Sequence, residues 1–115
     1  MADDDAEGEF RRWQHYHPNF IAPRLLRIKP VGKYVVELSK GDWLRNEPIY
    51  GVSLLEREGY EKFKNIGWRA NVNGAFYSLK EADKHFKRLA DVVESCQMYS
   101  DDEFIKCLKG RTWNW

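Results

Sequence analysis

The sequence predicts an α+β fold: a three- or four-stranded antiparallel sheet packed against one long helix in the C-terminal half, followed by a short second helix. Residues 33–39 and 49–56 alternate between apolar and polar side chains, which is typical of half-buried strands. From residue 79 onward, apolar side chains recur every three or four positions, which is typical of an amphipathic helix. Strands that precede helices in this order favour a sheet with one face covered.

The chain divides into three parts by composition. Residues 1–9 form an acidic tail that we expect to be disordered. Residues 10–23 form an irregular segment rich in basic and aromatic side chains, where two prolines break any helix. Residues 24–115 form a single α+β domain, and 115 residues of which 43% are hydrophobic suffice for one core.

The first strands are predicted to form a hairpin. An apolar run at residues 25–28 precedes a turn at residues 30–33, where Gly32 supplies the positive φ that such a turn needs. The next strand follows at residues 33–39. Turn-forming residues on either side then predict a loop that holds Trp43 and Leu44.

The middle of the chain is harder to assign. Residues 49–56 alternate as a third strand. Residues 57–67 fit either a helical turn or a wide loop, and residues 68–72 alternate again, which predicts a fourth strand.

Two capping boxes mark the helices. Ser78 with Glu81 opens the long helix, and Ser100 with Glu103 opens the short one, which Gly110 is expected to end. The long helix is expected to run to about Cys96. Its apolar stripe consists of Leu79, Ala82, Phe86, Leu89, Val93 and Cys96.

The cysteines and histidines do not form a recognisable catalytic or metal-binding motif in the sequence. Cys96 and Cys107 are too few to hold a fold of this size together, so we expect small buried thiols, although a helical hairpin would permit a disulfide. His15 and His17 lack the further paired ligands that a zinc site needs. No metal or cofactor is expected.

The expected cellular compartment follows from the targeting signals that the sequence does not show. The N-terminus carries acids where a signal peptide needs cations, and no run of about 18 apolar residues occurs. We therefore expect a cytoplasmic protein that does not contact a membrane.

Charge is distributed unevenly. The formal net charge is +1, but five of the 18 acidic residues lie in residues 3–9, and residues 10–36 contain none. The acid-free stretch carries several cations interleaved with aromatic rings, a pattern that suits phosphates and stacked bases. It equally suits a soluble domain with an acidic tail.

The leading functional hypothesis is a small non-enzymatic binding or adaptor protein that acts through protein–protein contacts. A small sheet cannot bury all of the tryptophans, so some are expected at the surface. Exposed tryptophans favour a binding role, because Trp is enriched in binding hot spots. The partner and the oligomeric state are not defined by the sequence. The candidate partner-binding residues are Trp13, Trp43, Trp113 and Trp115.

The alternative hypothesis is binding of single-stranded nucleic acid or another phosphate ligand through the basic, aromatic-rich segment 10–36. The long helix adds a basic stripe that includes Lys80 and Lys84. The candidate residues are Arg11, Arg12, Trp13, Arg24, Arg27, Lys29, Lys33 and Tyr34.

An enzyme is not expected, since the chain has no Gly-x-Ser-x-Gly sequence, no glycine-rich phosphate loop and no cysteine beside a histidine in sequence. Residues 74–82 resemble the strand-to-helix junction of the small DNA-binding module at the N-terminus of tyrosine recombinases. That resemblance covers about nine of 115 residues. It implies that strand residues including Lys33, Glu37 and Ser53 face DNA.

Overall fold

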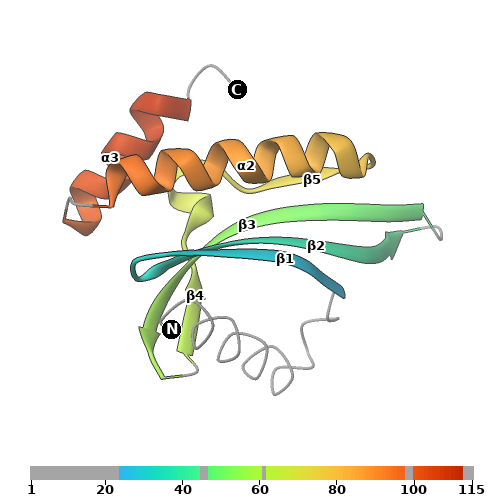
Figure 1. Cartoon of the computed structure of the whole chain (residues 1–115), viewed down its shortest axis with the longest axis horizontal. Coiled ribbons are helices and arrows are strands. Elements are labelled where there is room, and N and C mark those ends of the chain that lie inside the picture. Colours follow the sequence, from blue (N-terminus) through green and yellow to red (C-terminus); the bar gives the residue numbers. More distant parts are fainter. Residues whose placement is uncertain (1–23, 45–46, 61, 98–99, 113–115) are drawn as a thin grey trace.

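The structure is a computed structural model that describes residues 24–44, 47–60, 62–97 and 100–112. It confirms the α+β fold: an antiparallel sheet with one long and one shorter helix, both on one side of the sheet (Figure 1). The sheet has five strands, namely β1 (Arg24–Val31), β2 (Tyr34–Leu44), β3 (Glu47–Gly59), β4 (Lys62–Asn65) and β5 (Gly74–Phe76).

The strand order is β1-β2-β3-β4, and β5 pairs with β3 as well. The β1–β2 hairpin turns at Gly32, whose φ of 60° agrees with the turn predicted there. β4 and β5 share one edge of β3: β4 pairs with its C-terminal half and β5 with residues 50–52. The long strands β2 and β3 therefore form the centre of the sheet.

Two predictions for the connections were wrong. Trp43 and Leu44 do not lie in a loop, because β2 continues to Leu44 and pairs there with Glu47 of β3 after a shift in register. Residues 68–72 are not a strand. A 3-10 helix, η1 (Gly67–Ala70), takes their place, and the additional strand is β4 upstream of it.

The long helix α2 (Leu79–Cys96) begins at the predicted cap, where the Ser78 hydroxyl accepts a hydrogen bond from the Glu81 amide at 3.4 Å. Its predicted stripe is buried except for Leu79, which is 47% exposed because it lies in the first turn. Ala82, Phe86, Leu89, Ala90, Val93 and Cys96 pack against the sheet side chains Val36, Leu38, Val52 and Leu54.

The second helix, α3 (Asp101–Thr112), closes the end of this core. The ring of Phe104 stacks on Tyr34 of β2 with centroids 3.9 Å apart. Gly110 does not end the helix as predicted. The helix continues to Thr112, whose hydroxyl donates to the Leu108 carbonyl at 2.7 Å.

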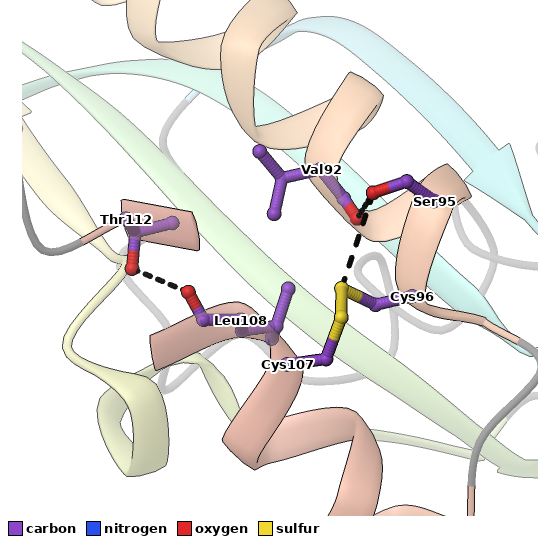
Figure 2. The surroundings of a disulfide bond; sticks show 6 residues. All are labelled: Val92, Ser95, Cys96, Cys107, Leu108 and Thr112. Atoms are coloured by element: carbon purple, nitrogen blue, oxygen red, sulfur yellow. Dashed lines mark hydrogen bonds between the residues drawn. A yellow bond between two sulfur atoms is a disulfide. The ribbon is translucent and has the colours of Figure 1, made fainter. Parts of the chain in front are cut away.

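The two cysteines are joined rather than free, so the expectation of separate buried thiols was wrong. Cys96 ends α2 and Cys107 lies in the middle of α3, with Cα atoms 5.9 Å apart (Figure 2). The hairpin between the helices brings together two residues 11 positions apart in the sequence. The bond therefore fixes α3 against α2.

Reduction of this disulfide is expected to lower the free energy of unfolding by about 3 kcal/mol, the loop-closure value for a ring of this length. Denaturant melts with and without a thiol reductant measure the difference. The Cys96→Ala/Cys107→Ala double variant is the control, since its midpoint should not respond to reductant. A wild-type midpoint that ignores reductant would show that the thiols are not joined.

Candidate functional site

The most exposed large apolar groups of the described residues are aromatic. Trp68 on η1 is 70% exposed, and an indole is the largest surface a side chain can offer a partner. Two tyrosines are similarly exposed at the ends of other elements: Tyr60 at 74% and Tyr77 at 73%. Trp68 lies on a turn that side-chain hydrogen bonds hold together.

The hydrogen-bond scaffold of this turn consists of two asparagines on either side of η1. The Asn65 side chain accepts from the Gly67 amide at 3.2 Å and from the Asn73 side-chain amide at 2.9 Å. Asn73 in turn accepts from the Leu54 amide of β3 at 3.0 Å. The turn is thereby tied to the central sheet.

The indole itself takes part in this scaffold. Its Nε1–H donates to the Asn65 carbonyl at 3.1 Å, so the polar end of the ring is fixed while most of the ring remains in solvent. Asn71 closes the turn in the left-handed conformation, with φ 54°. Its amide donates to the Trp68 carbonyl at 3.3 Å. Residues 65–73 therefore hold Trp68 in one place; we call them the Trp68 turn.

Charged side chains lie beside the turn. Arg69 Nη2 is 3.5 Å from Asp102 Oδ1, and the aspartate side chain is 89% exposed. Such an exposed pair contributes less than about 1 kcal/mol to stability. It joins a cation of η1, the element that carries Trp68, to an anion of α3.

The sequence analysis did not select Trp68. The signal that could have found it is turn chemistry: three asparagines and two glycines within residues 65–74 favour turns over a strand. Of the predicted partner-binding residues, Trp13, Trp113 and Trp115 lie outside the described residues. The backbone of Trp43 lies in β2, and its side chain is also outside the described part.

Only some residues of the nucleic-acid alternative lie in the described part of the chain. Arg11, Arg12, Trp13 and the side chain of Arg24 lie outside the described part of the chain. The remaining candidates are Arg27, Lys29, Lys33 and Tyr34. The Lys29 side chain is exposed, whereas Arg27 and Lys33 form ion pairs with other described residues.

The other three have different roles. Arg27 pairs with Asp83 of α2 at 2.6 Å, and Lys33 donates to Asp101 of α3, which raises the pKa of the lysine. Tyr34 is 1% exposed and belongs to the core, where burial raises its pKa to about 12. A ring in this position cannot stack on a base, so Tyr34 leaves the candidate set.

A small hollow lies between β5 and α2. It encloses about 220 Å³ and is lined by Phe76, Glu81, Lys84, His85 and Arg88. His85 points inward, with Nε2 at 2.7 Å from the Val72 carbonyl, and burial lowers its pKa. The volume is below the roughly 300 Å³ of ordinary ligand pockets, so a single small anion or side chain fits but a nucleotide does not.

A buried carboxylate lies on the side of the sheet away from the helices. Glu37 of β2 is 8% exposed, and its Oε2 atom has no hydrogen-bond partner among the described residues. Burial raises the pKa of Glu37 to about 7, because a charged carboxylate loses its hydration there. This placement does not suit the DNA-facing role implied by the recombinase resemblance.

Comparison with known proteins adds no further assignment: no family model, curated protein or solved structure matches the chain. Within the described residues, no helix is long and apolar enough to cross a membrane. The described histidine, cysteine and acidic side chains likewise contain no group of three arranged to hold a metal ion.

Gly67→Ala should damage the Trp68 turn, because a Cβ at this position overlaps the Asn73 side chain that binds the Leu54 amide. We expect a loss of about 2 to 3 kcal/mol in denaturant melts. Gly59→Ala is the matched control, since nothing lies within 4 Å of its added Cβ. Equal stability of the two variants would contradict the described packing.

Glu37 should make the domain less stable as pH rises. Its folded-state pKa of about 7 is above the ordinary glutamate value of 4.5, so its stabilising contribution is complete below about pH 4.5 and is lost as pH rises to about 7. The loss is on the order of 3 kcal/mol. Urea melts between pH 4.5 and 8 should show this decline in wild type and a flatter profile in Glu37→Gln. Parallel profiles would contradict the assignment.

Proposed function

We propose that this protein is a non-enzymatic binding module that docks onto a partner protein through the Trp68 turn. The observation that supports the proposal most directly is the indole of Trp68, which is 70% exposed on a turn cross-linked by side-chain hydrogen bonds. Burying such a ring in a partner removes a large apolar surface from water.

Rigidity is the second argument. Ordering a side chain or loop on binding costs free energy, so a site that is already ordered retains more of its contact energy. The Nε1 hydrogen bond to Asn65 and the link from Asn73 to β3 keep the turn in place before any partner arrives. Trp68 therefore meets the conditions typical of a binding hot spot.

The surroundings favour a mixed contact. Arg69 and Asp102 lie at the rim of the proposed surface and pair with each other. Rim charges of both signs affect orientation and the association rate more than affinity. We therefore propose a partner with an apolar cleft of indole size and polar groups around it.

The tryptophans selected from the sequence, Trp13, Trp43, Trp113 and Trp115, remain proposed contributors to partner binding. The phosphate alternative remains as a second candidate. It draws on the hollow beside α2, whose lining includes the basic side chains of Lys84 and Arg88 together with Glu81.

Trp68→Ala should remove partner binding without unfolding the domain. Proteins captured by the wild-type chain are identified by mass spectrometry, and the affinity of each is then measured for wild type, Trp68→Ala and Tyr77→Ala. We expect Trp68→Ala to weaken binding by roughly thirtyfold or more, the effect of losing a hot spot of about 2 kcal/mol. Its melting midpoint should stay close to that of wild type, because exposed substitutions cost little.

Tyr77→Ala is the matched control, since it removes a ring of similar exposure at another place. Equal loss of binding by both variants, or no loss by either, would contradict the proposal. Oligonucleotide binding tighter than about 1 μM at physiological salt would favour the phosphate alternative instead, because non-specific binding is normally weaker. Perturbed NMR signals at Lys84 and Arg88 in that titration would place it at the hollow.

A further inference from the structure

The side of the sheet away from the helices is buried, although no described helix lies over it. Its side chains alternate with those of the helix-facing core: Val35 is 1% exposed, Leu55 is 3% and Phe63 is 7%. Figure 1 shows both α2 and α3 on the opposite side. We call this side, formed by Leu25, Ile28, Val35, Glu37, Ser39, Leu55 and Phe63, the outer face.

The chemistry of the outer face is apolar with one acid. In the strand register, Glu37 lies between Ile28 of β1 and Ser53 of β3, and neither is a cation. Glu37 and Ser39 are nevertheless 8% and 5% exposed. Something must exclude water from these side chains, and a cationic or neutral cover is favoured over an acidic one because a carboxylate lies beneath it.

We propose that residues 10–23 of this chain cover the outer face of the sheet. The length of this segment is the first reason. The other undescribed pieces, residues 45–46, 61, 98–99 and 113–115, contain at most three residues each and cannot cover a sheet. Residues 10–23 number 14 and run directly into β1. If extended, they would match the 13 residues of β3, the longest strand.

Composition selects residues 10–23 over the tail before them. Residues 3–9 carry five acids, which would face the Glu37 carboxylate across a dry interface. Residues 10–23 carry no acid and provide both cations and large rings. The rings suit the apolar part of the outer face, and a segment without acids places no second carboxylate beside Glu37. The aromatic members are Phe10, Trp13, Tyr16 and Phe20.

Hydrogen–deuterium exchange on the full chain tests the proposal. Peptides from residues 10–23 should exchange at least about tenfold more slowly than their unstructured rate, while peptides from residues 1–9 should exchange at that rate. Val35→Thr keeps the side-chain shape but places a hydroxyl on the outer face, and it should remove most of this protection.

Val36→Thr is the matched control, because Val36 is adjacent, 0% exposed and on the helix side. It should lower global stability while leaving exchange of residues 10–23 unchanged. Phe63→Leu replaces Val35→Thr if that variant fails to fold. Unprotected residues 10–23 in wild type, or equal effects of the two valine variants, would overturn the proposal. A dimer in light scattering with unprotected residues 10–23 would assign the face to a second copy.

Discussion

Alternation along β2 sends Val36 and Leu38 toward the helices and Val35 and Glu37 toward the outer face, and all four are almost fully buried. A strand with two buried faces needs a layer on each, since apolar area is costly to leave exposed to water. Burial of the Glu37 carboxylate, by contrast, is a cost that the second layer imposes. The helices supply one layer. We propose residues 10–23 for the other, because they combine large rings with cations and contain no acid.

The position of α3 connects the core to the Trp68 turn. Its disulfide to α2 and the stack of Phe104 on Tyr34 fix the helix, and its first turn then meets both the β1–β2 hairpin, at Lys33, and η1, at Arg69. The hydrogen bond from Lys33 lowers the pKa of Asp101. Because these pairs are exposed, they orient the elements more than they stabilise them. The turn is thus held by the sheet through Asn73 and flanked by α3.

Local signals predicted the starts of both helices and the turn of the first hairpin correctly, because residues such as Ser78, Glu81 and Gly32 act on their own backbone within a few residues. The connection after β3 was not predictable in the same way. Residues 68–72 alternate like a strand, but Asn65 and Asn73, eight positions apart, bind each other and hold the backbone in a 3-10 turn. The exposure of Trp68 follows from that long-range contact. The disulfide likewise depends on a helix-hairpin angle that spacing alone does not define.

The disulfide also bears on the expected cytoplasmic location, which stays a prediction. Structural disulfides are rare in reducing compartments, so the bond and that expectation point in opposite directions. Magnitudes decide whether the fold requires the bond. α3 buries Phe104, Ile105 and Leu108, each worth roughly 1.5 to 3 kcal/mol, whereas the bond contributes about 3 kcal/mol. Burial of these three side chains is therefore the larger gross contribution, from which the conformational entropy of ordering α3 is subtracted.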